Sequence, residues 1–388
     1  MAQPKADVVV VPPAAMPEPD IAAELDALAA RSSPSPTTTS GAAPAAARPP
    51  LVVVGHRGSG MNALAAAPED PRARGGDVRE NTLRSFNAAA AAAGVAYVEF
   101  DVQVTKDGCP VIFHDNFIYT EENFQGEISG KRVTDLDLDE FLSYGPQRNQ
   151  EKAGKPLLRK LKDGRILRWE ARSEDALCTL REAFEGVDRR VGFNVELKFD
   201  DNLAYTEAAL AAALRAVLEV VFEHAGGRPV IFSSFQPDAA QLVRKLQDKY
   251  PVYFLTNGGT QMYADPRRNS LEEAVRLCVA AGLQGIVSEV RAILRQPAAV
   301  AKIKEAKLSL MTYGQLNNVP EVVYVQHLMG VDGVIVDRVL EIAEAVSAFP
   351  AAAGESGSSE GGGRCERLGT AAAAGTPSFS TPEMSFHY

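Results

Sequence analysis

Short apolar runs alternate with amphipathic segments of helical length through the middle of this 388-residue chain, and no other feature constrains its fold as strongly. Runs such as VVV and PVIF are typical of strands in a parallel sheet that is covered on both faces. The predicted strands are Leu51–Gly55, Tyr97–Val102, Pro110–Phe113, Val191–Leu197, Pro229–Ser233, Val252–Leu255, Gly285–Ser288, Leu308–Thr312 and Gly333–Val336. The predicted helices are Thr82–Ala93, Cys178–Phe184, Thr206–His224, Asp238–Lys249, Leu271–Ala281, Ala298–Ala306 and Val319–Met329.

This alternation extends over about 250 residues, the usual length of a (β/α)8 barrel. The sequence therefore predicts an α/β fold of the TIM-barrel type, with an open doubly wound sheet as the alternative. The predicted strands number one more than such a barrel needs, and only a short polar segment separates the second from the third. Because Asp107-Gly108 in that segment is a hairpin-turn signal, we expect one of these strands to be a hairpin or rim strand.

A polar stretch that is too long for an ordinary loop follows the third predicted strand. We predict that it is an insertion folded over the mouth of the barrel, with small elements around Asp137–Ser143 and Arg165–Trp169. Both ends of the chain are low in complexity and are predicted to be disordered. The expected organisation is a disordered N-terminal segment 1–49, a barrel domain 50–347 with the insertion 116–177, and a disordered tail 348–388.

The charge balance limits the classes of partner. The formal net charge is −10 and the pI is near 5.2, which argues against nucleic acid or an anionic membrane as a general partner. No apolar run approaches the length of about 18 residues that a membrane span requires. A small-molecule substrate remains the expected partner, and the sequence leaves the oligomeric state open.

The N-terminal residues bear on location. The apolar run Val8–Val11 is too short for a secretory signal, and two prolines follow it. The hydroxyl-rich stretch Ser32–Ser40 fits a plastid transit peptide, but acidic residues such as Glu18 and Asp20 do not. We therefore expect a cytoplasmic protein, with a plastid location as the alternative.

Ionisable residues occupy or follow several predicted strands at their carboxyl ends, which meet at one rim of a barrel, where TIM-barrel chemistry takes place. Each group alone also has a structural reading, such as a helix cap, a salt bridge or a turn. Their joint position at one rim favours function. They are His56 and Arg57 after the first strand, Glu99 and Asp101 within the second, His114 and Asp115 after the third, and Glu196 and Lys198 at the end of the fourth.

Glu99 and Asp101 are two positions apart in one strand and therefore share a face. Two buried carboxylates repel each other and lose hydration, unless a cation lies between them. With Glu196 they form an all-oxygen set, and the four cysteines show no CxxC spacing, so the sequence indicates a hard cation such as Mg²⁺ or Ca²⁺ rather than zinc. Two histidines near such a metal suit acid–base catalysis.

Five motifs follow one another along the chain: HRGSG, RENT, VEFDVQVTKDG, VIFHD and NVELK. In this order they resemble the signature of the glycerophosphodiester phosphodiesterases, and the resemblance covers roughly residues 51–345. The stretch GHRGSGMN, the RENT motif and the long insertion resemble the plant members most. One departure is the segment from Ser59 to Asp77, which is longer than we expect for compact members and bears on substrate access.

The resemblance implies a TIM-barrel enzyme that hydrolyses glycerophosphodiesters, such as glycerophosphocholine, to sn-glycerol 3-phosphate and an alcohol. It implies that the glycerol hydroxyl beside the phosphoester attacks phosphorus while one histidine takes its proton and the other protonates the leaving alcohol. Water then opens the cyclic phosphate with the histidine roles reversed. The implied roles are metal binding for Glu99, Asp101 and Glu196 (Mg²⁺ first, with Ca²⁺ or Mn²⁺ as alternatives), acid–base catalysis for His56 and His114, phosphate binding for Arg57 and Lys198, and support from behind these groups for Glu80.

Three alternative functions remain at this point. A phosphodiesterase of the same chemistry that acts on lysophospholipids is the nearest, and an apolar patch at the barrel mouth would favour it. A non-catalytic barrel would have lost motif residues, yet all of them are present. A phospholipase C-like enzyme for inositol lipids would need a basic amphipathic surface, which the sequence does not show.

Overall fold

The computed structural model describes residues 50–62, 77–122, 127–149 and 151–349. The terminal segments that were predicted to be disordered lie outside these residues, except for Ala348 and Phe349. Most of the long segment between the first two motifs, residues 63–76, also lies outside them.

The central sheet closes on itself. Strand β1 (Val52–Gly55) pairs in parallel with both β2 (Val95–Val104) and β13 (Gly333–Val336), so it has no free edge. An open doubly wound sheet would leave two edges unpaired, and the predicted TIM barrel is therefore confirmed. The other barrel strands are β8 (Gly192–Leu197), β9 (Val230–Ser234), β10 (Val252–Thr256), β11 (Gly285–Glu289) and β12 (Ser309–Tyr313).

The additional predicted strand is a hairpin partner, as the sequence indicated. Strand β3 (Pro110–Ile112) runs antiparallel to the end of β2. The turn between them includes Gly108, whose φ of 85° lies in the left-handed region that glycine tolerates. This hairpin extends β2 beyond the barrel and directs the chain toward His114.

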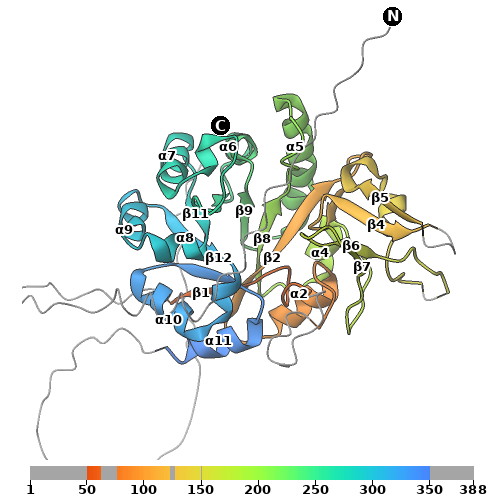
Figure 1. The fold of residues 1–388 in the computed structure, drawn as a ribbon, viewed down its shortest axis with the longest axis horizontal. Helices are drawn as coiled ribbons and strands as arrows, with labels where there is room; N and C mark the ends of the chain where they lie inside the picture. Colours follow the sequence, from red (N-terminus) through yellow and green to blue (C-terminus); the bar gives the residue numbers. More distant parts are fainter. Residues whose placement is uncertain (1–49, 63–76, 123–126, 150, 350–388) are drawn as a thin grey trace, which may run out of the picture.

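Helices connect the strands and surround the barrel (Figure 1). They are α2 (Leu83–Ala90), α4 (Leu180–Gly186), α5 (Glu207–His224), α6 (Pro237–Leu246), α7 (Leu271–Ala281), α8 (Val290–Arg295), α9 (Ala298–Glu305), α10 (Pro320–Met329) and α11 (Val339–Ser347). The 3-10 turns are η2 (Val133–Asp135), η3 (Pro266–Arg268) and η4 (Gln315–Asn318). Every predicted helix is present within a few residues. No helix of the described segments has the length and apolar character to cross a membrane.

Side chains point alternately inward and outward along each barrel strand, and they form two apolar layers. One lies between the strands and the outer helices, and the other lies inside the barrel. In β2, Val98, Phe100 and Val102 belong to the large core between the strands and the outer helices. A separate cluster that includes Val54 and Val287 fills the inside of the barrel. Because neighbouring positions of a strand face opposite ways, the polar residues of β2 point to the barrel interior.

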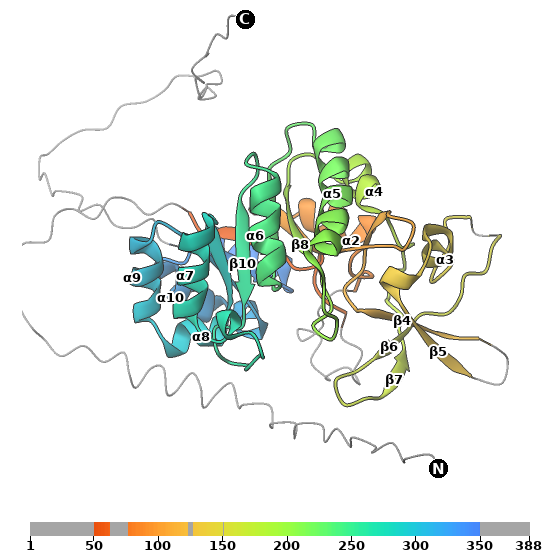
Figure 2. The same ribbon diagram turned by 90° about the horizontal axis from the view of Figure 1, so that it is seen from above.

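The predicted insertion has its own sheet and core. Its strands β4 (Phe117–Glu121), β5 (Ile128–Arg132), β6 (Leu158–Lys160) and β7 (Ile166–Arg168) pair in the order β5-β4-β6-β7, and α3 (Leu138–Leu142) packs beside them. Phe113, Phe141 and Trp169 are buried in a core that the insertion shares with the end of the β2–β3 hairpin. Figure 2 shows this sheet and α3 to one side of the barrel.

Candidate active site

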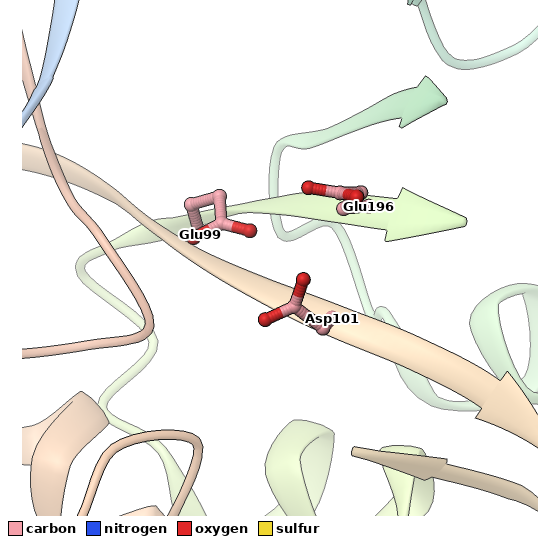
Figure 3. A group of neighbouring side chains, drawn as sticks. All are labelled: Glu99, Asp101 and Glu196. Carbon is pink, nitrogen blue, oxygen red and sulfur yellow. The ribbon is translucent and has the colours of Figure 1, made fainter. Parts of the chain in front are cut away.

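Three carboxylates lie together in the barrel interior. Glu99 and Asp101 project from β2, and Glu196 projects from the adjacent strand β8, where it is in register with Asp101 (Figure 3). One oxygen from each lies within 4.8 Å of the others. The strand alternation that buries Phe100 against the helices places these acids on the opposite, interior face.

The surroundings of two of these carboxyls, Glu99 and Glu196, disfavour the charged form. Burial, followed by the neighbouring Asp101 carboxylate, raises the pKa of Glu99 to about 8. Burial also raises the pKa of Glu196, against the opposing effect of Lys198. A set of oxygen donors whose charges repel in this way fits a divalent hard cation, which would satisfy all three carboxylates at once.

Arg57 lies in the turn after β1, beside Glu99 and Asp101. Its backbone N–H donates to Glu99 at 2.9 Å, and its Nη1 donates to Glu80 at 2.7 Å. Its Nε lies 3.5 Å from Asp101 but has no hydrogen-bond partner, although it is buried. Burial opposes the charge of Arg57, yet Glu80 and Asp101 outweigh it and raise the pKa of the guanidinium.

His56 begins this turn and contacts the residue that follows the last barrel strand. Its Nδ1 lies 2.7 Å from an oxygen of Asp337, the first residue after β13. Burial lowers the pKa of His56, but the Asp337 carboxylate more than offsets this, so that the pKa is raised above its usual value. The environment therefore favours the protonated imidazolium at this position.

His114 has the opposite electrostatic environment. Burial, together with the cations of Arg57 and Lys198, lowers the pKa of His114 well below its usual value. Its Nδ1 lies 2.7 Å from Asp115, and a carboxylate there accepts a hydrogen bond, which leaves Nε2 as the unprotonated nitrogen. The surroundings of the two histidines thus shift their pKa values in opposite directions.

Lys198 directly follows β8 and lies beside Glu196 and Asp101. Its Nζ is 2.9 Å from Glu196 and 3.4 Å from Asp101. Although burial opposes its charge, both carboxylates raise its pKa, so it remains a cation. It also lines a cavity of about 610 Å³, together with His114 and Glu196.

Glu80 connects several of these groups from behind. It is 1% exposed and accepts hydrogen bonds from Arg57, from the guanidinium of Arg159 and from the backbone N–H of Asn62. Burial raises the pKa of this carboxyl, but Arg57 and Arg159 dominate and lower it to about 2. Glu80 therefore remains ionised and holds the two arginines in place.

All the site residues expected from the sequence come together at this end of the barrel. His56 directly precedes Arg57, whose backbone N–H donates to Glu99, and His114 lines the same cavity as Glu196, so both histidines lie near the carboxylates. The residues brought together are His56, Arg57, Glu80, Glu99, Asp101, His114, Glu196 and Lys198.

Three residues that contact the candidate site were not identified from the sequence. Asp337 follows β13 as His56 follows β1, so the strand-end rule that identified the other residues also applied to it. Asn81 lies in the RENT motif and donates to Asp101 at 2.8 Å, with a φ of 57° that asparagine tolerates. Arg159 lies in the polar insertion, and nothing in its local sequence marked it.

Comparisons with known proteins agree with this geometry. A sequence model of the glycerophosphoryl diester phosphodiesterase family matches residues 56–341. Glycerophosphodiester phosphodiesterase GDPD2 of Arabidopsis thaliana is 59% identical over 299 residues, which cover 77% of this chain and 78% of the relative. Glycerophosphodiester phosphodiesterase GDPD1, chloroplastic, of the same plant is 59% identical over 297 residues, covering 76% of this chain and 80% of the relative.

Solved structures support the same fold. The structure of a glycerophosphodiester phosphodiesterase from Parabacteroides distasonis superposes with a TM-score of 0.53 at 19% sequence identity, covering 78% of this chain and 98% of that chain. The enzyme class and the plant-type resemblance expected from the motifs are confirmed. The chain belongs to the glycerophosphoryl diester phosphodiesterase family.

Proposed function

We propose that this chain hydrolyses glycerophosphodiesters in a divalent-metal-dependent reaction, with His114 as general base and His56 as general acid of the first step. The observation that carries the proposal is the pair of histidines near one carboxylate cluster, with their pKa values shifted in opposite directions. Two titratable groups whose environments separate their pKa values are the usual sign of an acid and a base acting together.

Glu99, Asp101 and Glu196 would hold the metal ion. All three donors are carboxylate oxygens, a set that suits Mg²⁺ best, with Ca²⁺ or Mn²⁺ as alternatives. When bound, a divalent cation supplies Lewis-acid polarisation of a phosphoryl oxygen and favours the alkoxide form of a nearby hydroxyl.

The histidines would move the protons. Nε2 of His114 accepts the proton of the glycerol hydroxyl beside the phosphoester as that oxygen bonds to phosphorus. His56 donates its Nε2 proton to the alcohol oxygen as the bond from phosphorus to that oxygen breaks. In the second step, His56 accepts a proton from water that attacks the cyclic phosphate, and His114 returns its proton to the glycerol oxygen. Each histidine is expected to contribute about 10²–10⁴-fold to the rate.

Arg57 and Lys198 would bind the remaining phosphate oxygens. The Nε of Arg57 is a buried donor with no hydrogen-bond partner, and it lies beside the carboxylate cluster. The ammonium of Lys198 lines the cavity next to Glu196. Both cations would therefore lie where negative charge develops on the phosphoryl group.

We propose glycerophosphocholine as a substrate and sn-glycerol 3-phosphate as the product. The cavity of about 610 Å³ extends from His114 and Lys198 to aromatic residues of the insertion and of the barrel loops, which leaves room for an alcohol beyond the phosphate. Phe117 and Tyr119 lie on the insertion side, and Phe235 and Tyr263 lie on the barrel side.

The test is release of glycerol 3-phosphate from glycerophosphocholine by the full-length protein, with EDTA and then with Mg²⁺, Ca²⁺ or Mn²⁺ added back. Activity that disappears with the chelator and returns with one metal is the expected result, and His56→Ala and His114→Ala should each remove it. Activity that survives exhaustive chelation would contradict the metal requirement. Activity on lysophospholipids alone would replace the proposed substrate class.

We further propose that residues 50–347 form one catalytic domain in the cytoplasm, with the plastid as the alternative location. Helix α11 ends at Ser347, so this range contains every described barrel strand and helix. Equal kcat for the fragment 50–347 and the full chain would support the boundary. A fluorescent fusion of the full chain that accumulates in plastids would reject the cytoplasmic location.

A further inference from the structure

Arg159 lies in strand β6 of the insertion, outside the barrel, yet its guanidinium reaches the site. The residue is 8% exposed. One edge of the guanidinium faces Asp115, with Nε at 2.8 Å and Nη2 at 3.0 Å from its two oxygens. The other edge faces Glu80, with Nη1 at 3.1 Å and Nη2 at 3.0 Å.

Each of these two carboxylates accepts a hydrogen bond from a residue that takes part in the proposed reaction. Asp115 accepts from Nδ1 of His114 at 2.7 Å, which fixes the ring and leaves Nε2 to face the reaction. Glu80 accepts from Nη1 of Arg57 at 2.7 Å. Arg159 therefore lies one contact away from both the candidate base and a candidate phosphate ligand.

The position of Arg159 is itself fixed. Its guanidinium stacks on the ring of Trp169, with 4.3 Å between Cζ and the ring centroid. Nε1 of Trp169 donates to the side-chain oxygen of Asn62 at 3.1 Å, and the backbone N–H of Asn62 donates to Glu80 at 2.6 Å. The contacts thus form a closed circuit from Glu80 through Arg159 and Trp169 back to Glu80.

Only arginine can make this set of contacts. Its planar guanidinium has five N–H donors in a fixed fork, and two edges are in use here. A lysine ammonium is a single point charge that cannot bridge two carboxylates along two edges or stack flat on an indole ring.

We propose that Arg159 is a positioning residue, through which the insertion sets the orientation of His114 and Arg57. The insertion is then a part of the catalytic apparatus as well as a wall of the cavity. This inference rests on the proposed function, because it needs His114 to act as the base. It acts through Asp115 and Glu80, and Arg159 itself touches no reacting atom.

The first experiment compares Arg159→Lys with Arg168→Lys in the full-length protein, with glycerophosphocholine and saturating Mg²⁺. Arg168 is a matched control because it lies in the neighbouring strand β7, with its side chain 61% exposed and 3.7 Å from Glu170. We expect Arg159→Lys to lower kcat about 10–100-fold, as removal of an outer partner of a catalytic group does. We expect KM to change less than about threefold, and Arg168→Lys to change neither constant. Equal kcat values for the two variants overturn the inference.

A second experiment separates positioning from general destabilisation. If Arg159 acts through Asp115, the effects of Arg159→Lys and Asp115→Asn on kcat are not additive. The kcat of the double variant should then lie within about threefold of the kcat of the less active single variant. Losses that multiply in the double variant overturn the route through Asp115, and with it the claim that the insertion orients His114. Trp169 is the only tryptophan of the chain and contacts Arg159 directly, so its fluorescence reports on the packing of the insertion. A kcat loss in Arg159→Lys that is accompanied by the emission of unfolded protein overturns the inference as well.

His114→Ala distinguishes this inference from the function on which it rests. If His114→Ala keeps near wild-type activity, the proposed function is wrong. If His114→Ala is inactive while Arg159→Lys matches the wild type, the proposed function stands and the positioning role of Arg159 is rejected.

Discussion

His56 and Asp337 are 281 positions apart in the sequence, yet Nδ1 of the first lies 2.7 Å from Oδ1 of the second. One follows the first barrel strand and the other follows the last, so this contact lies at the seam where the barrel closes. Asp337 also accepts from the backbone N–H of Met61 and from the side chain of Asn318, at 2.9 and 3.0 Å. It is therefore fixed on several sides, and it orients the imidazole of His56.

Asp337→Asn should lower kcat by about 10² or more, because the amide has no charge to stabilise the imidazolium of His56. KM should change little. Steady-state kinetics with glycerophosphocholine measures both constants. Asp332→Asn is the control: Asp332 precedes the same strand and pairs with Lys304 at the opposite end of the barrel, so it should affect stability rather than kcat. Equal kcat values for the two variants would contradict the role of Asp337.

Glu196→Gln should weaken binding of a divalent cation at least about tenfold, because it removes one of three anionic donors. Direct titration with Mn²⁺, followed by electron paramagnetic resonance, measures this without any reliance on turnover. Glu289→Gln is a matched control, because Glu289 also ends a barrel strand but its carboxylate caps α8 through the N–H of Ala292 at 3.2 Å. If both variants bind Mn²⁺ as the wild type does, the three carboxylates are not the metal site.

Glu80→Gln should make the protein less stable, and the loss should depend on pH. The pKa of Glu80 is about 2 in place of 4.5, because Arg57 and Arg159 outweigh burial, which corresponds to about 3 kcal/mol of stability. This contribution is fully present above pH 4.5, because the folded-state pKa is the lower one, and it is lost as pH falls from about 4.5 toward 2.

Urea unfolding at a series of pH values tests this expectation. The difference in the free energy of unfolding between wild type and Glu80→Gln should be largest at neutral pH and should shrink below pH 4.5. Glu272→Gln, which alters a carboxylate that is 68% exposed, controls for the removal of a charge. A difference that stays constant down to pH 3 would show that the ionised carboxylate of Glu80 contributes nothing.

The barrel and most of the site were predictable because both depend on local signals. Apolar runs, helical periodicity and the Asp-Gly turn identified the strands, the helices and the β2–β3 hairpin. Glu99 and Asp101 stood out because charged residues at alternate positions of an otherwise apolar strand have few structural explanations. Helices α8 and α11 were not among the predicted helices. Helix α8 follows β11 directly, with Glu289 as both the strand end and the helix cap, so no loop separates the two elements.

The remaining parts of the site depend on contacts between distant segments. The register that puts Asp101 opposite Glu196 is set by the pairing of β2 with β8, and no sequence pattern encodes it. The contact of His56 with Asp337 exists only because the barrel closes. Arg159 belongs to a three-residue strand in a polar stretch, where the period is too short to indicate which side chain turns inward.

Gly58→Ala is expected to damage both stability and activity, for two reasons that a control can separate. Gly58 has a φ of 93°, which an alanine adopts only with strain. A Cβ at this position would also lie 2.4 Å from Oγ and 2.7 Å from the carbonyl carbon of Ser85 at the start of α2. Because backbone atoms of a helix cannot yield, the turn itself must move, and it carries His56 and Arg57 with it.

Gly108→Ala isolates the first reason. Gly108 has a similar φ of 85°, but nothing lies within 4 Å of an added Cβ. This variant should lose only the cost of the strained backbone, about 1–3 kcal/mol, and keep its kcat. Gly58→Ala should lose more free energy of unfolding and, at a temperature where both variants are folded, at least about tenfold in kcat. Equal stability and equal kcat in the two variants would mean that the turn moves without cost, and that the close approach of Gly58 to α2 does not place the catalytic residues.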